Sequence, residues 1–164
     1  MIVIKTATAK DFPVIQSIAY TTWPETYGQI LSKAQLDYML DRFFSLDNLA
    51  LNLKNDHQFY VIYEDEMPLG FIGIEHNHND EFVTKIHKIY MLPSYQGKGI
   101  GKLTIDFIID IALKNQSQKL RLNVNKFNKA IIFYQKLGFE TVEAIDIEIG
   151  NGYLMEDFVM EKIL

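Results

Sequence analysis

The chain has 164 residues, of which 48% are hydrophobic and 23% are charged, and its formal net charge is −5 at pH 7. This length and composition favour one globular domain, residues 1–164, with a single substantial core, and the acidic balance argues against a nucleic-acid partner. The absence of cysteine excludes disulfides, thiolate metal ligands and a cysteine nucleophile, and no apolar run has the length that a membrane span requires.

The N-terminal third is predicted to contain one strand and two helices. Val3–Thr6 alternates as a strand does, and a helix is expected to begin near Asp11. The segment Thr21–Gly28 is expected to interrupt regular structure. A second helix is predicted over Ser32–Phe44, and Ser45–Lys54 is expected to hold a further helical turn or two.

The rest of the chain is predicted to combine six strands with two helices, and Asn151-Gly152 is typical of a tight hairpin turn. The expected strands are Phe59–Tyr63, Leu69–Ile74, Val83–Met91, Leu120–Val124, Thr141–Ile149 and Tyr153–Ile163, and the expected helices run to about Lys114 and over Asn128–Leu137. His76 and His78 are assigned to a solvated hairpin tip. No third ligand at a usual spacing accompanies them, so no metal site is expected.

The segment Gln96–Lys102 is the most informative motif, because it places glycines between a predicted strand and a predicted helix. Such a turn leaves backbone N–H groups unpaired, and together with the positive end of the helix dipole they bind phosphate. The glycine spacing fits neither the P-loop nor the dinucleotide-binding fingerprint. The remaining pattern is Q-x-x-G-x-G, with Gln96, Gly99 and Gly101 at its fixed positions.

Two further segments accompany this turn in the order of one known superfamily. Asn128–Phe139 reads N-x-A-x-x-F-Y-x-K-x-G-F, and Ile89–Pro93 forms the end of the preceding strand. As a set, these segments resemble the GCN5-related N-acetyltransferase (GNAT) superfamily over roughly residues 59–139. The resemblance implies an α/β (α+β mixed) fold with a central mixed, largely antiparallel sheet and helices on both faces. It also implies an acyltransferase that uses acetyl-coenzyme A.

The resemblance places the cofactor along the strand end, the glycine turn and the second signature. The implied cofactor-binding residues are Tyr90, Met91, Leu92, Gln96, Gly97, Lys98, Gly99, Ile100, Gly101, Lys102, Asn128, Tyr134 and Lys136. Asn128 is as well suited to capping the following helix.

Tyr134 is implied to be the general acid that protonates the departing thiolate, since a phenol keeps its proton at neutral pH. Without the signature around it, the same tyrosine would be read as a core aromatic. The base is left open. Where some family members carry a glutamate, this chain has Asn123, so we expect His87, Glu75 or an ordered water to serve instead.

The acceptor is expected to be the primary amine of a small, polyamine-like molecule that attacks the thioester directly. Aromatic residues beside a carboxylate suit an ammonium group, which makes Trp23, Glu25, Tyr27 and Tyr153 the candidate substrate-binding residues. Thr22–Tyr27 and the C-terminal segment also resemble, more weakly, the bacterial spermidine/spermine acetyltransferase-like branch. A peptide or protein amine, or a non-catalytic acyl-coenzyme A-binding module, are the alternatives.

Location and assembly are predicted only in outline. Met1–Lys5 is strand-like and too short for a signal peptide, so a cytoplasmic protein with no membrane partner is expected. A homodimer is possible, because relatives in the superfamily commonly pair through their late strands.

Overall fold

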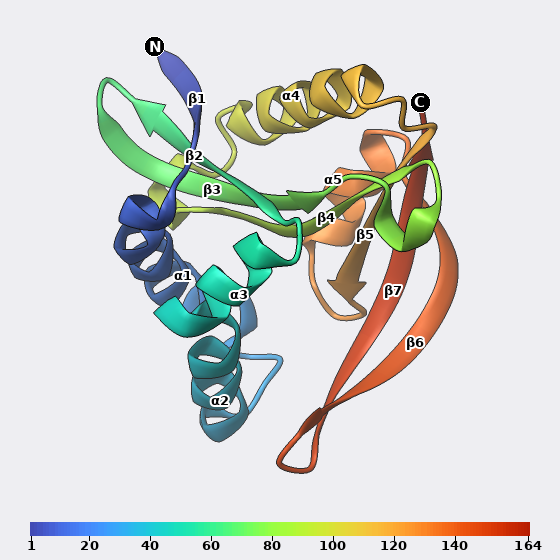
Figure 1. The fold of residues 1–164 in the computed structure, drawn as a ribbon. Coiled ribbons are helices and arrows are strands. Elements are labelled where there is room, and N and C mark those ends of the chain that lie inside the picture. Colours follow the sequence, from blue (N-terminus) through green and yellow to red (C-terminus); the bar gives the residue numbers. More distant parts are fainter.

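The computed structural model describes residues 1–164 as one seven-stranded sheet with five α-helices (Figure 1). The strand order is β1-β2-β3-β4-β5-β7-β6, and every neighbouring pair is antiparallel except β4 and β5, which run parallel. The strands are β1 (Ile2–Thr6), β2 (Gln58–Glu64), β3 (Met67–Glu75), β4 (Val83–Met91), β5 (Lys119–Asn125), β6 (Glu140–Gly150) and β7 (Tyr153–Ile163). The predicted strands and the mixed, largely antiparallel sheet are therefore confirmed.

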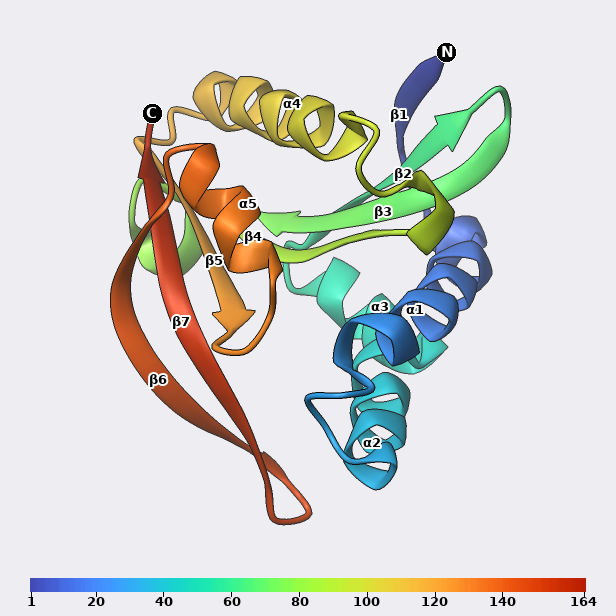
Figure 2. The same cartoon turned by 180° about the vertical axis from the view of Figure 1, so that it is seen from behind.

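Helices cover both faces of this sheet, as expected. They are α1 (Phe12–Tyr27), α2 (Lys33–Phe44), α3 (Leu46–Lys54), α4 (Ile100–Lys114) and α5 (Ala130–Lys136). One core packs α4 and α5 against the sheet, with Ile105 and Ile108 fully buried. The other core packs α1, α2 and α3 against the opposite face, around Ile15, Leu40 and Phe44. Figures 1 and 2 show the two helical layers on opposite sides of the strands.

One prediction about the N-terminal helices is wrong. Thr21–Gly28 was expected to break regular structure, but α1 continues to Tyr27 with Pro24 inside it. The burial of Thr22 and Trp23 against the neighbouring core outweighs the hydrogen bond that a proline removes.

The helical turns expected over Ser45–Lys54 are present as α3. The Ser45 side chain caps this helix by accepting from the Asn48 N–H (3.2 Å).

The parallel strands β4 and β5 separate halfway along their length. Their pairing ends at Ile86 and Leu122, although β4 continues to Met91 and β5 to Asn125. Beyond that point the two strands diverge, which Figure 2 shows from behind. The gap exposes unpaired backbone edges in the middle of the sheet, and the candidate site is built around it.

Candidate functional site

The glycine turn before α4 presents a row of free backbone donors. The N–H groups from Gly97 to Lys102 donate to no carbonyl or side chain of the protein. Gly97 and Gly99 have φ values of 77° and 79°, and a Cβ at either position would meet no atom within 4 Å. Positive φ requires glycine here, and the open space lets a ligand approach the amides. This cradle at the positive end of a 15-residue helix fits a pyrophosphate.

The neighbouring residues hold this turn against the strand and helix. Gln96 Nε2 donates to the Met91 carbonyl (3.1 Å), which ties the turn to the end of β4. Gly101 packs under the Phe133 ring, where a Cβ would lie 3.0 Å from the ring carbon Cζ. Lys98 and Lys102 are exposed beside the cradle, and Lys102 pairs with Asp106 one helical turn later.

The end of β4 offers one further donor towards the gap. The Leu92 N–H bonds to the Leu69 carbonyl of β3 (2.8 Å). Since successive N–H groups of a strand point to opposite sides, the Met91 N–H points away from β3, towards the separated edge. Met91 therefore suits the role of a donor to a thioester carbonyl.

A cavity of about 360 Å³ opens on the α1–α2 side of this gap. It is bounded by α1, α2, the diverging strands and the β6–β7 hairpin. Its lining residues are Trp23, Tyr27, Leu31, Gln35, Met39, Arg42, Phe43, Phe44, Lys85, Ile86, His87, Lys88, Tyr90, Asn123, Asn125, Ile147, Glu148, Ile149, Leu154, Met155 and Asp157.

The β6–β7 hairpin closes the far side of the cavity by docking on α2. Tyr38 Oη donates to the Ile149 carbonyl (2.8 Å), and Gln35 Nε2 donates to the Leu154 carbonyl (2.8 Å). Arg42 donates to the same Ile149 carbonyl. These contacts limit the cavity on the side of the hairpin.

Three polar groups in the cavity wall lack partners within the protein. Asp157 is 2% exposed and forms no hydrogen bond or ion pair, and burial raises the pKa of its carboxyl to about 6. Asn123 Oδ1 and Trp23 Nε1 are buried without a hydrogen-bond partner. Asn125 lies opposite Asp157 in the β5–β7 pairing, so Asn123 and Asp157 share one face of the sheet. Buried polar groups are nearly always paired, so these groups are candidate ligand contacts.

Two lysines also line the cavity. Burial lowers the pKa of Lys85, and its ammonium forms no ion pair with a carboxylate. Lys88 Nζ donates to Asn52 Oδ1 (3.0 Å), and burial lowers its pKa to about 8. Their positive field disfavours the protonated form of an amine bound nearby.

A group of tyrosines lies next to the cavity. The hydroxyls of Tyr27 and Tyr90 are 3.3 Å apart. Tyr134 is 8% exposed, and its hydroxyl forms no hydrogen bond within the protein. Burial first, and then the proximity of Tyr27, raise the pKa of Tyr134, so this phenol stays protonated at neutral pH. A protonated, unpaired hydroxyl can act as a proton donor.

The two alternative bases expected from the sequence contact each other. His87 Nε2 lies 2.9 Å from Glu75 Oε1. Burial lowers the pKa of His87 to about 3, an effect that the nearby His57 strengthens and Glu75 opposes. His87 lines the cavity but is a weak proton acceptor, whereas Asp157 titrates nearer to neutral pH.

Other expected site residues lie at the margin or outside. Glu25 is exposed and does not line the cavity, and Tyr153 packs on Tyr38 with ring centroids 5.3 Å apart. Asn128 Oδ1 accepts from the Ala130 N–H (2.9 Å), which orders the turn before α5, although the N-cap residue of that helix is Lys129. Lys136 is exposed in the last turn of α5.

Sequence reasoning missed Asp157. It stands on the same face of β7 as Met155 and Val159, both apolar. The sequence could have indicated it, because an acidic residue stands there at an inward position of an alternating strand.

No helix of the structure is long and apolar enough to cross a membrane.

The chain matches the model of the acetyltransferase (GNAT) family over residues 13–139. It is 26% identical to the spermidine N(1)-acetyltransferase of Thermoplasma acidophilum over 97% of this chain and 95% of that protein. It is 33% identical to an uncharacterized N-acetyltransferase of Methanocaldococcus jannaschii over 56% of this chain, but the match spans only 43% of that longer relative. Among solved structures, PaiA N-acetyltransferase from T. acidophilum in complex with coenzyme A superimposes with a TM-score of 0.83, at 25% identity, covering 100% of this chain and 99% of that one.

Proposed function

This chain belongs to the acetyltransferase (GNAT) family, and from that premise we propose that it transfers an acetyl group from acetyl-coenzyme A to the primary amine of a small, polyamine-like molecule. The full-length similarity to a spermidine acetyltransferase supports this acceptor class. The observation that carries the proposal is the unpartnered carboxylate of Asp157 inside a bounded cavity.

The cofactor side is held by the chain's own amides. The donors from Gly97 to Lys102 would bind the pyrophosphate, and the Met91 N–H would polarise the thioester carbonyl. Acetyl-coenzyme A supplies the activated acetyl group when it is bound. The separated ends of β4 and β5 leave room for its reactive end to meet the acceptor.

The acceptor side recognises an ammonium group. Asp157 provides the negative charge, and Asn123 Oδ1 provides a second acceptor on the same face of the sheet. Trp23, Tyr27 and Tyr90 surround the cavity with aromatic rings, which also attract cations. The β6–β7 hairpin docked on α2 narrows this space, which supports a small amine over an extended polypeptide.

Acetyl transfer then needs three proton movements. Asp157 takes a proton from the ammonium group and releases it to solvent, and the fields of Lys85 and Lys88 favour the neutral amine. As the new C–N bond forms and the C–S bond breaks, Tyr134 Oη gives its proton to the departing sulfur. The acetylated nitrogen gives up its second proton to the ionised Asp157 carboxylate, which passes it to solvent, and Tyr134 is reprotonated from solvent before the next turnover.

Thiol release from acetyl-coenzyme A tests this function with spermidine, spermine, putrescine, free amino acids and short peptides as acceptors. We expect turnover with the polyamines, and a loss of at least about 100-fold in kcat/KM for Asp157→Asn, since a charged contact is removed. The matched control is Glu156→Gln, which changes the adjacent, exposed residue on the opposite face of β7.

Two outcomes would contradict the proposal. Turnover restricted to peptide amines would favour a peptide or protein acetyltransferase. Binding of acetyl-coenzyme A without thiol release for any acceptor would favour a non-catalytic binding module.

A further inference from the structure

Three of the four histidines converge on a single carboxylate oxygen. Glu75 Oε1 lies 2.9 Å from His87 Nε2, 3.3 Å from His78 Nδ1 and 3.5 Å from His57 Nε2. The four groups come from separate segments: the link between α3 and β2, the end of β3, the following short turn and the middle of β4. Only the tertiary structure brings them together.

The distances from Glu75 Oε1 to the three imidazoles are compatible with one shared ion, although the imidazoles must draw together to bind it. Four ligands at about 2.0–2.1 Å from a tetrahedral ion lie roughly 3.3–3.4 Å from one another. The ligand atoms of His57, Glu75 and His87 all lie within 4.8 Å of one another. Imidazole nitrogens with one carboxylate oxygen are ligands that zinc and similar transition metals favour.

Binding one ion would require a change in the orientation of the imidazole rings. The rings of His57 and His87 are stacked, 4.1 Å apart and 11° from parallel, so their nitrogen lone pairs do not meet at one point. One ring must turn to bind the same ion as the other. His57 Nδ1 is buried without a hydrogen-bond partner, so no bond from that nitrogen opposes such a turn.

His78 contacts Glu75 but lies outside the group whose ligand atoms are all within 4.8 Å of one another, so its ring must move to join the same ion. The plane of its ring is inclined by 80° to that of His87. Its Nδ1 is also buried without a hydrogen-bond partner. The side chains of the four groups retain only 13–22% exposure.

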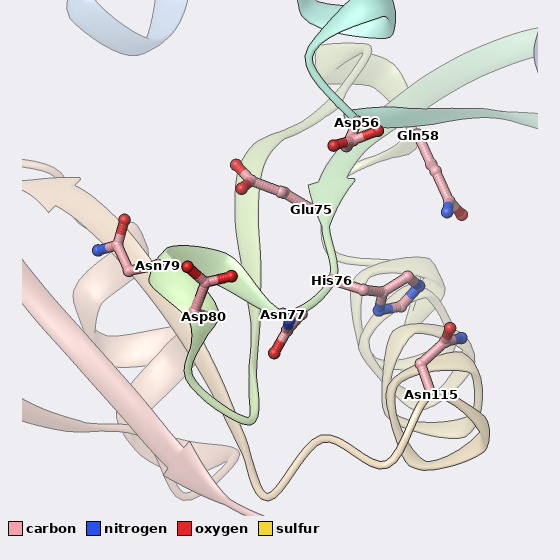
Figure 3. Close-up of a pocket in the computed structure, with 8 residues that line it drawn as sticks. All are labelled: Asp56, Gln58, Glu75, His76, Asn77, Asn79, Asp80 and Asn115. Carbon is pink, nitrogen blue, oxygen red and sulfur yellow. The ribbon is translucent and has the colours of Figure 1, made fainter.

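Glu75 also faces a second, wholly polar cavity, of about 440 Å³, on the side of the hairpin between β3 and β4 (Figure 3). Its lining residues are Asp56, Gln58, Glu75, His76, Asn77, Asn79, Asp80 and Asn115. The carboxylates of Asp56 and Asp80 would draw a cation towards Glu75 from solvent. Of the four groups, Glu75 borders this polar cavity, and His87 borders the acceptor cavity.

We propose that Glu75, His57, His78 and His87 bind one divalent transition-metal ion of the zinc type. The sequence predicted no metal site, because His76 and His78 showed no third ligand nearby. In the structure His76 is the histidine outside the set, with its Nδ1 2.7 Å from Thr84 Oγ1. A bound ion would fasten the α3–β2 link and the β3–β4 turn to the strand whose His87 borders the acceptor cavity. This inference does not rest on the proposed acceptor.

Calorimetry with Zn²⁺ on chelator-treated, tag-free protein tests the site, together with the visible absorption of the Co²⁺ form. We expect one ion per chain with a dissociation constant in the micromolar range or below, a tetrahedral Co²⁺ spectrum and a higher Tm with Zn²⁺. His57→Gln, His78→Gln, His87→Gln and Glu75→Gln should each weaken Zn²⁺ binding at least tenfold. The matched control His76→Gln should bind as the wild type does.

The titration of the wild-type protein with Zn²⁺ shows whether the site binds an ion, even if a variant fails to fold. Binding weaker than millimolar, or equal losses in His76→Gln and His87→Gln, would overturn the proposed site. Because these readouts are ion binding and Tm, they are independent of any acetyltransferase assay.

Discussion

Tyr134 is a buried phenol whose hydroxyl forms no hydrogen bond within the protein. Its proposed role as general acid can therefore be tested without changing the stability of the fold. Tyr134→Phe removes no hydrogen bond, so the Tm and the affinity for coenzyme A should stay close to wild type. Turnover should fall by about 10²–10⁴-fold, the usual contribution of a general acid. Steady-state kinetics beside calorimetry with coenzyme A measures both, and wild-type turnover would remove Tyr134 from the mechanism.

Asp157 sets the expected pH dependence at low pH. Burial raises the pKa of this carboxyl to about 6, and the ionised form is the one that attracts an ammonium group. The kcat/KM for a polyamine should therefore rise as pH increases through about 6. The Asp157→Asn profile should lack this rise while its residual activity is low throughout. If the rise in kcat/KM near pH 6 persists in the variant, a group other than Asp157 causes it.

At the scale of single elements, the glycine turn before α4 is predicted to bind coenzyme A, and a substitution in it tests this. Gly99→Ala places a Cβ at a φ of 79°, which costs about 1–2 kcal/mol and fills the space beside the free amides. Coenzyme A affinity should drop at least tenfold. Gly152→Ala is the matched control, since Gly152 has a φ of 77° and equally open surroundings in the distant β6–β7 turn.

Comparing the two glycine variants separates strain from ligand contact. Both should lose similar stability in thermal unfolding, but only Gly99→Ala should lose affinity for coenzyme A. Equal affinities in the two variants would show that the turn does not contact the cofactor.

For the whole molecule, Asp157 imposes a stability cost that depends on pH. Its folded pKa of about 6 lies above the ordinary value of 3.8, so ionisation is less favourable in the folded state. The stability associated with the protonated form is present below about pH 4 and is lost as pH rises through about 6. This difference between the two pKa values corresponds to at most about 3 kcal/mol in the free energy of unfolding.

Asp157→Asn should therefore raise the Tm by several degrees at pH 7.5 and by little near pH 4, which differential scanning fluorimetry can follow. A lower Tm for the variant at pH 7.5 would show that the ionised carboxylate has a stabilising partner in the folded protein. An acid kept in place at a cost to stability is typical of a functional site.

The assembly state stays a prediction at this scale. Strand β6 forms one edge of the sheet, and most of its residues are exposed. An expected homodimer through the late strands would cover this edge.

The sequence by itself determined the family and the cofactor, and it predicted the cofactor side of the site. Glycines at positive φ, a strand before them and a helix after them are local requirements, so adjacent residues specify them, and the predictions of family, fold class and coenzyme A are confirmed. The continuation of α1 through Pro24 was not predictable in this way, because burial of Trp23 by a distant core decides it.

Only the tertiary structure decided which residues line the cavity proposed for the acceptor. The register of β5 with β7 places Asp157 opposite Asn125, on the same face of the sheet as Asn123, and the β6–β7 hairpin docks on α2 beside them. It also gathers His57, His78 and His87 on Glu75. These groups lie far apart along the chain, and sequence spacing does not encode which inward positions of separate strands share a cavity.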